Sequence, residues 1–301
     1  MRLSGRFTLL DSAPDGDSIH FIPDQPQWLQ AQAPAAGGFP PRHSALPGAR
    51  ALRWSPRGAI TVRLEGIDAL ETHYLAKGGL GVLSQPPPWA EQAAGALLRF
   101  LGFERVVRGP DERILGTEPA ATRGAIQLER VDRYGRAVAY AFRGNIHGSD
   151  LAAPSPTSTV LASSANGYLL QQGLVYPVLY QDMALNTLRW LYQQTQQVRA
   201  AGRGLWPMDL TQVGFAWHSL QEFQQRALIW PKLYRRLVDQ IGSVAHAPLA
   251  SLAQALDQRV GSVLLWRQGV AVSFADLLHI DPQNHRVRLL VLPEEIAFHS
   301  D

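Results

Sequence analysis

The chain contains no cysteine, which excludes disulfides, thiolate catalysis and zinc or iron–sulfur sites with cysteine ligands. Any bound metal must therefore have oxygen or imidazole ligands. Long hydrophobic runs are also lacking: the apolar stretch 289–292 ends at a proline, whereas a membrane-spanning helix needs roughly 20 apolar residues in succession. Residues 1–10 have neither the apolar core nor the cleavage site of a secretory signal. The sequence thus predicts a cytoplasmic protein that does not span a membrane.

Lysine is almost absent, since Lys77 and Lys232 are the only two in 301 residues. The 28 basic residues, nearly all arginine, exceed the acidic residues by three. This arginine bias has two explanations, genome composition or a preference for bidentate contacts with phosphate. The positive excess lies in residues 1–206, with 20 basic and 16 acidic side chains, whereas residues 207–301 have 8 and 9. We therefore expect the first two thirds of the chain to be the side that binds a polyanion.

Hydrophobic periodicity predicts both strands and helices. Short alternating or β-branched runs indicate strands at 6–10, 18–22, 60–67, 125–128, 137–142, 263–266 and 285–292. Apolar residues at helical spacing indicate helices at 89–101, 166–172, 181–200, 218–241 and 248–259. Residues rich in proline, glycine or serine predict a loop at 150–164 and insertions at about 24–58 and 73–87.

The charge balance changes at Trp206, which is followed by Pro207. We therefore predict two domains, 1–206 and a smaller accessory domain of mixed α/β structure at 207–301. No catalytic constellation is visible in 207–301, and its aromatic residues are typical of a core or an interface. This second domain is expected to dock against the first or to form a homo-oligomer.

Acidic and arginine side chains recur together in short segments of a chain in which only 18% of the residues are charged. Two or three converging carboxylates suit a hard divalent cation such as Ca²⁺, which polarises a phosphoryl oxygen or activates water. Arginines supply paired donors for phosphate oxygens and for the charge that builds on them, and a further carboxylate can orient the attacking water. The candidates are Asp15, Asp17, Arg63, Asp68, Glu71 and Arg136.

Taken singly, each segment has a plain structural interpretation. The Asp-Gly-Asp run at 15–17 is typical of a turn, and Asp68 with Glu71 suits a solvated loop or a helix cap. Arg63 and Arg136 suit surface or structural ion pairs. The order and spacing of the segments favour a functional interpretation.

In that order and spacing the chain resembles the staphylococcal-nuclease-like, or thermonuclease, family. The family pattern begins with Asp-Gly-Asp-Thr and a strand, and continues with segments of the types R-x-x-G-I-D-A-P-E-T and D-x-Y-G-R-x-x-A-Y. The matching segments are 15–19 (DGDSI), 63–72 (RLEGIDALET), 132–140 (DRYGRAVAY), 166–174 (NGYLLQQGL) and 204–206 (GLW). Five matches in the same order make the resemblance specific, and residues 207–301 lie outside it.

The resemblance implies an α+β fold, with a five-stranded OB-type β-barrel and packed helices. It also implies an endonuclease that hydrolyses phosphodiester bonds of DNA or RNA with Ca²⁺. Carried over position by position, Asp17 and Asp68 would bind Ca²⁺ through their carboxylates and Ala69 through its carbonyl. Glu71 would hold the attacking water.

The same comparison assigns the substrate contacts. Arg63 and Arg136 would bind the scissile phosphate and stabilise its transition state, and Tyr134, with Arg133 beside it, would face the nucleotide. For Tyr180 two interpretations stay open, a base-stacking platform or packing of the barrel.

Leu70 stands where the family has a proline, which removes a fixed φ from the turn that aims Glu71. The alternative function is therefore a catalytically weak or inactive module of this family that binds nucleic acid or a protein partner. Retention of the acidic residues and of both arginines argues against this alternative.

Overall fold

The computed structural model describes residues 1–10, 12–30, 51–109, 113–144, 155–216, 219–243, 261–281, 283–284 and 286–300. These residues form two compact units. Unit 1 consists of Met1–Glu65 and Ala94–Leu169, and unit 2 of Gly66–Ala93 and Leu170–Ser300. The predicted helix over 248–259 lies outside the described residues, as do residues 31–50 of the first predicted insertion.

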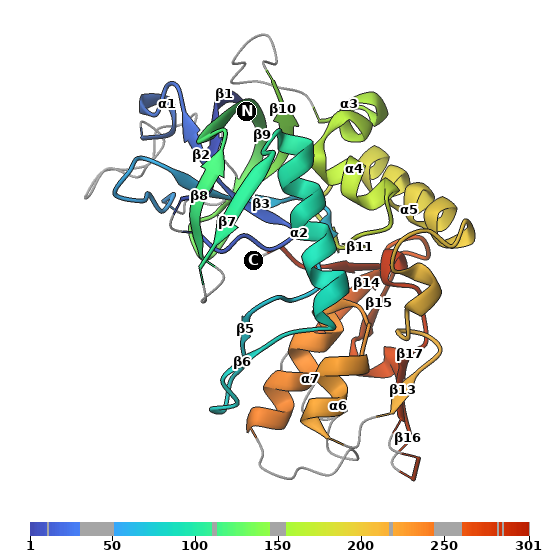
Figure 1. The fold of residues 1–301 in the computed structure, drawn as a ribbon. Helices are drawn as coiled ribbons and strands as arrows, with labels where there is room; N and C mark the ends of the chain where they lie inside the picture. Colours follow the sequence, from blue (N-terminus) through green and yellow to red (C-terminus); the bar gives the residue numbers. More distant parts are fainter. Residues whose placement is uncertain are drawn as a thin grey trace, which may run out of the picture. The chain divides into compact units, whose positions relative to one another are not determined.

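Unit 1 is built on a closed five-stranded β-barrel (Figure 1). Neighbouring strands are antiparallel except β3 and β10, which run parallel with Val62 opposite Ala137. The predicted five-stranded barrel is thus confirmed, and each of its strands overlaps a predicted one. The order around the barrel is β1 (Arg2–Thr8), β2 (Ser18–Pro23), β3 (Ile60–Leu64), β10 (Ala137–Arg143) and β9 (Ala121–Val131).

Two glycines let the barrel enclose two phenylalanine rings. Gly5 of β1 lies opposite Gly124 of β9. The rings of Phe7 and Phe21 are fully buried, with their centroids 5.2 Å apart. A Cβ atom at position 124 would lie 2.2 Å from the Phe7 ring, so only glycine fits there without a shift of the ring or the strand.

Helices and a hairpin complete unit 1. Phe100 of α2 stacks on Tyr168 of α4, with ring centroids 4.9 Å apart, so that the predicted helices over 89–101 and 166–172 pack together. The β7–β8 hairpin was not predicted, and α3 lies in a range that was expected to be a loop. The elements are α1 (Gln27–Gln30), the part of α2 (Pro87–Leu101) from Ala94, β7 (Arg105–Arg108), β8 (Ile114–Glu118), α3 (Ser158–Ser163) and α4 (Ala165–Gln171) up to Leu169.

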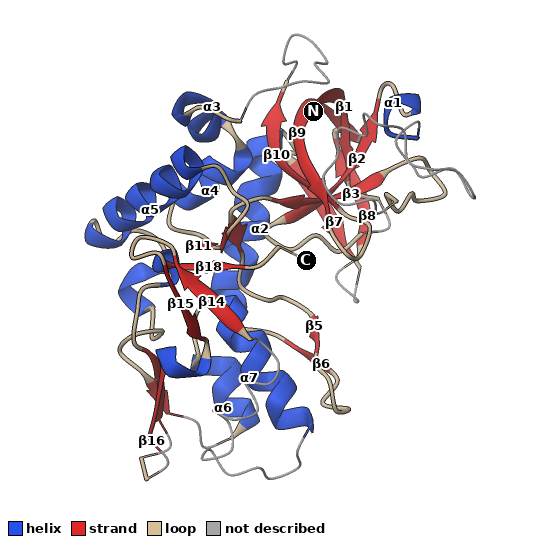
Figure 2. Ribbon diagram, turned by 180° about the vertical axis from the view of Figure 1, so that it is seen from behind, coloured by secondary structure: helices blue, strands red, loops and turns tan. Residues whose placement is uncertain are grey.

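Unit 2 combines short strands with longer helices (Figure 2). A four-stranded sheet contains β12 (Leu179–Tyr180), β18 (Ile296–Phe298), β14 (Ser262–Leu265) and β15 (Val270–Ser273) in that order. A three-stranded sheet contains β13 (Phe215–Ala216), β17 (Arg286–Leu289) and β16 (Leu278–Asp281). Two-stranded pairs are formed by β4 (Ile67–Asp68) with β11 (Tyr176–Pro177) and by β5 (Tyr74–Leu75) with β6 (Val82–Leu83).

The helices of unit 2 agree in part with the sequence. The predicted helix over 181–200 is confirmed as α5, whereas the predicted helix over 218–241 is two helices. Pro231 begins the second of them, because it has no N–H with which to continue the first. The elements are α5 (Leu185–Ala200), α6 (Leu220–Arg226), α7 (Pro231–Ser243) and the 3₁₀ turns η1 (Trp206–Met208), η3 (Ala275–Leu277) and η4 (Pro293–Glu295).

One hydrophobic core unites the segments of unit 2. Leu70 and Tyr176 belong to the same buried cluster as Trp230 and Phe298. The Trp230 indole N–H also donates to the carbonyl of Pro177, at 3.2 Å. The compact units therefore differ from the division predicted at Trp206: residues 66–93 and 170–206 group with 207–300, because the side chains of the last segment are buried against theirs.

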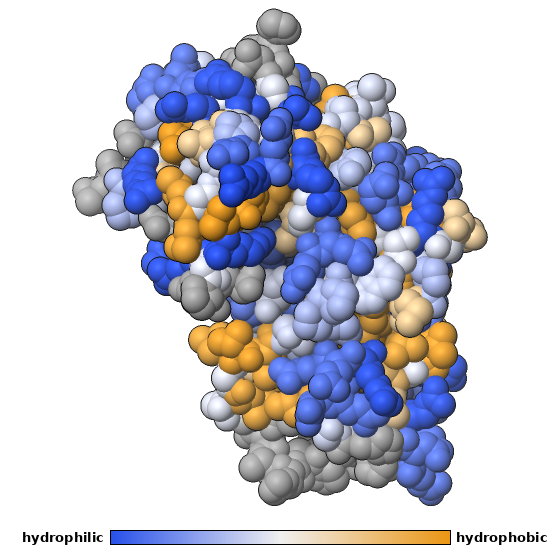
Figure 3. Space-filling view, in the orientation of Figure 1, coloured by the Kyte–Doolittle hydropathy of each residue, from blue (hydrophilic) through white to orange (hydrophobic). Residues whose placement is uncertain are grey.

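Exposed apolar side chains gather on two hairpins. Leu75 and Val82 project from β5 and β6 of unit 2, and Val107 and Leu115 from β7 and β8 of unit 1. Figure 3 shows hydrophobic surface over both hairpins. Among the helices that the structure describes, none is long and apolar enough to cross a membrane.

The close approach at Gly124 predicts a large effect of a small substitution. Gly124→Ala should destabilise unit 1 by about 1–3 kcal/mol, the usual cost of inserting a methyl group into a filled core. Gly116→Ala in β8 is the matched control, since a Cβ atom there meets nothing within 4 Å. Urea unfolding monitored by circular dichroism measures both variants, and equal stability of the two would contradict the packing described here.

Candidate functional site

Three predicted site residues lie at the ends of neighbouring barrel strands in unit 1. Asp17 immediately precedes β2, Arg63 lies in β3, and Arg136 immediately precedes β10. Ser18 is the register partner of Arg63, and Val62 is the partner of Ala137. Residues distant in sequence are therefore brought together because their strands are adjacent in the barrel.

The two acids of the Asp-Gly-Asp turn have different roles. Asp15 accepts a hydrogen bond from the Ser18 hydroxyl at 2.6 Å, which is the plain turn interaction considered above. Asp17 is 1% exposed, and its carboxylate accepts a hydrogen bond from a guanidinium Nη1 of Arg63. Burial makes an ionised carboxylate costly unless it is paired, so this ion pair fixes the position of Arg63.

Arg136 is held by the turn that precedes β10. The Asp132 carboxylate accepts hydrogen bonds from the backbone N–H groups of Tyr134 and Arg136, both at 2.9 Å, and from Nε of Arg136 at 2.7 Å. Gly135 has a φ of +78°, and a Cβ atom there would lie 3.0 Å from Arg53. The turn thus requires glycine, and it orients the Arg136 side chain through the first carboxylate of the D-x-Y-G-R motif.

Tyr134 contacts two guanidinium groups and is 58% exposed. The central carbon of Arg133 is 4.9 Å from the ring centroid and that of Arg136 is 5.3 Å from it. Arg133 also donates to the tyrosine hydroxyl at 2.9 Å. We call Arg133, Tyr134 and Arg136 the barrel-end cluster. Its exposed ring and cationic groups can stack on a base and bind phosphate.

A buried asparagine explains the fourth matching segment. The amide nitrogen of Asn166 donates to the carbonyls of Glu65 at 2.8 Å and Ala139 at 3.2 Å, and its oxygen accepts from the N–H of Ala141 at 3.1 Å. Glu65 is itself buried and paired with Arg130 at 2.8 Å. Asn166 therefore joins the end of β3 to β10, and it supports the positions of the two site arginines without touching them.

The remaining predicted acids belong to unit 2, where α7 supplies a partner that the sequence did not reveal. Asp68 ends β4, opposite Tyr176 of β11, and is fully buried. Both of its oxygens accept hydrogen bonds from Arg235, at 3.2 and 2.7 Å, in a bidentate arrangement. The same guanidinium also donates to the Glu71 carboxylate. Arg235 thus bridges the predicted metal ligand and the predicted catalytic acid.

Charge, rather than burial, decides the protonation of Arg235. Burial lowers its pKa, but the negative charges of Asp68 and Glu71 more than offset this and raise the pKa well above its ordinary value. The neighbouring Arg236 has the opposite balance: burial, followed by repulsion from Arg235, lowers its pKa to about 10. Both guanidinium groups therefore stay charged near neutral pH.

Gln85 holds the turn in which Leu70 replaces the family's proline. The side-chain oxygen of Gln85 accepts a hydrogen bond from the backbone N–H of Glu71 at 3.2 Å. The backbone N–H of Gln85 donates in return to the carbonyl of Glu71 at 2.8 Å. The side-chain amide nitrogen of Gln85 donates to the carbonyl of Ile229 at 2.7 Å. Leu70 is fully buried in the core of unit 2. Hydrogen bonds and side-chain burial thus constrain a backbone that proline would otherwise fix.

Tyr180, for which the sequence left two interpretations open, and the nearby Tyr176 are both in unit 2. Tyr176 is fully buried, and its hydroxyl donates to Asp209 at 2.7 Å; burial, followed by the charge of Asp209, raises its pKa. Tyr180 is partly buried in β12 and accepts a hydrogen bond from Lys232 at 3.2 Å, with the ammonium also 4.6 Å from its ring centroid. Tyr176 is therefore a core residue, and Tyr180 is engaged with α7.

Both predicted carboxylate ligands of Ca²⁺ are engaged within the protein. Ca²⁺ takes six to eight oxygen ligands. The carboxylate of Asp17 accepts a hydrogen bond from Arg63, that of Asp68 accepts hydrogen bonds from Arg235, and Ala69 is buried beside Asp68 in the chain. Across the residues that the structure describes, no group of three or more acidic or histidine side chains could hold a metal ion.

No family model matches the chain, and a search of curated proteins found no match either.

The Arg235 bridge predicts a strong and non-additive effect on stability. Arg235→Met should destabilise unit 2 by about 3–5 kcal/mol, because it removes one partner of a buried ion pair. Combining it with Asp68→Asn should restore part of that loss. Arg226→Met is the matched control, since Arg226 is 78% exposed and its pair with Glu222 contributes about 0.5 kcal/mol at most.

Urea unfolding monitored by tryptophan fluorescence measures the wild type, Arg235→Met, Asp68→Asn, the double variant and Arg226→Met. Additive effects of Arg235→Met and Asp68→Asn would show that the two side chains are not coupled.

Proposed function

We propose that unit 1 binds the phosphodiester backbone of DNA or RNA, and that its barrel is an OB-type fold of the thermonuclease kind. The supporting observation is that Arg63 and Arg136 lie on neighbouring strands, with the exposed ring of Tyr134 stacked beside Arg136. Guanidinium forks bind phosphate oxygens in pairs, and an exposed aromatic ring stacks on bases without regard to sequence.

Arg136 keeps donors available for such a ligand. Its Nε is committed to Asp132, while its two terminal amino groups make no hydrogen bond with any residue that the structure describes. The side chain is therefore oriented by one carboxylate and still presents a fork to solvent. Because these contacts address phosphate and the face of a base, they predict tolerance of sequence rather than a specific site.

Variants of the barrel-end cluster test nucleic-acid binding directly. Tyr134→Ala should weaken binding of a short single-stranded oligonucleotide by about 1–3 kcal/mol through lost stacking. Arg136→Gln should also weaken it and reduce the slope of log affinity against log salt by about one. Fluorescence anisotropy in a chelating buffer at several salt concentrations measures both effects.

The control for these variants is Arg105→Gln in β7, which removes a charge from an exposed residue of the same unit. Affinities that fall equally for Arg105→Gln and Arg136→Gln would indicate attraction by net charge alone and would sink the proposed binding site.

Hydrolysis of the bound phosphodiester is the second candidate function. It is favoured by the retention of all the charged residues of the family pattern, and by Gln85, which fixes the backbone of Glu71 in place of the missing proline. The opposing observation is the Arg235 bridge, which commits Asp68 and Glu71 to a guanidinium group. As long as Arg235 remains paired with both acids, we expect nucleic acid to be bound but not cleaved.

A cleavage assay separates the two candidates. A nuclease should cut labelled single-stranded DNA or RNA in Ca²⁺ and not in chelator. Arg136→Gln should then lower the rate about 10²–10³-fold, as expected for one lost preorganised donor, and Glu71→Gln should abolish cleavage but retain binding. Salt-dependent binding of the wild-type protein with no cleavage in Ca²⁺ would exclude hydrolysis and leave the binding module.

A further inference from the structure

The three-stranded sheet of unit 2 has one apolar face and one charged face. The side chains that alternate inward belong to the hydrophobic core of the unit: Phe215, Leu278, Val287 and Leu289. The residues between them in β16 and β17 point the other way. Arg286, Arg288 and His279 are exposed on that outer face. Strand pairing places His279 opposite Arg288 and Asp281 opposite Arg286.

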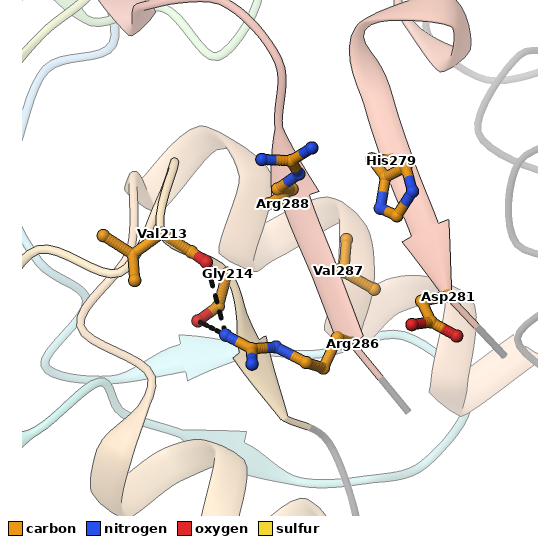
Figure 4. A pocket seen from close by; sticks show the side chains of 7 residues that line it. All are labelled: Val213, Gly214, His279, Asp281, Arg286, Val287 and Arg288. Carbon is orange, nitrogen blue, oxygen red and sulfur yellow. Dashed lines mark hydrogen bonds between the residues drawn. The ribbon is translucent and has the colours of Figure 1, made fainter. Parts of the chain in front are cut away.

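These polar side chains line a pocket of about 250 Å³ (Figure 4). Its walls include Arg286, Arg288, His279 and Asp281, together with Val213 and Gly214 from the segment before β13. Two guanidinium groups and an imidazole therefore share one concave surface. It lies in residues 207–301, the segment to which the sequence assigned no chemistry.

Arg286 is anchored without being neutralised. One of its terminal nitrogens donates to the carbonyls of Val213 and Gly214, both at 3.3 Å. Figure 4 shows the side chain reaching from β17 to these two carbonyls. Neutral acceptors fix the orientation of the guanidinium group but leave its charge uncompensated.

Gly214 keeps this corner of the pocket open. Its φ is +93°, and a Cβ atom there would lie 3.4 Å from the Cβ of Arg288 and 3.6 Å from the guanidinium of Arg286.

Arg288 makes no hydrogen bond or ion pair with the part of the chain that the structure describes. Asp281, the only carboxylate among the described residues that line the pocket, is already satisfied by the turn that follows β16. It accepts hydrogen bonds from the side chain of Asn284 at 2.7 Å and from the N–H groups of Gln283 and Asn284, both at 3.1 Å. The side-chain and then the backbone bond from Asn284 lower its pKa. With two arginines against one acid, the pocket has a net positive charge.

Charge and size together indicate the ligand. Two guanidinium groups repel metal cations, and their planar forks match the oxygens of phosphate. The volume is below the roughly 300–1,000 Å³ of pockets that enclose whole drug-sized ligands, so a single oxyanion fits better than an entire nucleotide. We propose that this pocket binds one phosphate group, held by Arg288 and Arg286 with His279 at its side.

The test is titration of the full-length protein with inorganic phosphate, monitored by isothermal calorimetry. The wild-type protein should bind phosphate saturably, and Arg288→Gln and Arg286→Gln should each weaken binding about tenfold or more, as for a lost charge-assisted hydrogen bond. Arg203→Gln is the matched control, because Arg203 is an exposed arginine of unit 2 outside the pocket. It should leave the affinity unchanged.

No saturable binding, or equal weakening by Arg203→Gln and Arg288→Gln, would overturn the proposal. Because Arg288 has no hydrogen bond to lose in the described residues, its replacement should preserve the fold, which circular dichroism verifies. Because unit 1 is itself proposed to bind phosphate, the titrations are repeated with Arg136→Gln present, and Arg288→Gln should weaken the remaining phosphate binding in that variant by the same factor.

A competition experiment identifies the source of the phosphate. An oligonucleotide with a 5′-phosphate and the same oligonucleotide without it are each added to the phosphate-loaded protein. Displacement by the phosphorylated strand alone assigns the pocket to a terminal phosphate, and displacement by both strands assigns it to the backbone. The strands are therefore titrated into a protein that carries Arg136→Gln, and if adding Arg288→Gln to it leaves the affinity for both strands unchanged, displacement arises elsewhere and the assignment to this pocket is wrong.

Discussion

Pairing of buried carboxylates with arginine is the constraint on which both units depend. An ionised carboxylate inside a protein is costly unless a cation and hydrogen bonds compensate it. In this chain the cation is repeatedly arginine, whose planar fork satisfies two oxygens at once. The arginine bias, which the sequence left as genome composition or phosphate binding, thus has a structural component as well. The pairs are Asp17 with Arg63, Glu65 with Arg130, Asp68 with Arg235, and Glu294 with Arg199.

The strands of the barrel could be predicted because they are long enough to show alternation, whereas their closure into a barrel was implied only by the family resemblance. The strands of unit 2 could not all be predicted, because several span only two to four residues and give no periodic signal. The hairpin β7–β8 was missed for another reason: its side chains are mostly exposed, so no apolar pattern marks it. The predicted division at Trp206 followed a change of charge, whereas the compact units follow buried contacts.

The candidate site, like the fold, could be predicted only in part from the sequence. Asp17, Arg63 and Arg136 were grouped through the order and spacing of the family motifs, and the structure places them at the ends of neighbouring barrel strands. Arg235 could not be predicted, because its contacts with Asp68 and Glu71 join positions more than 160 residues apart. The only signal was a pair of arginines within an amphipathic helix, which ordinarily indicates a solvated face. Gln85, likewise, stands in a stretch that composition marks as a loop.

The position of β18 in unit 2 determines when that unit can form during synthesis. This strand pairs with β12 on one side and β14 on the other, and Phe298 joins the core around Trp230. The barrel of unit 1 has all five strands once residue 143 has left the ribosome. Unit 2 has to wait for Ile296–Phe298, so its earlier segments, including 66–93, must remain without their final partners while most of the chain is translated.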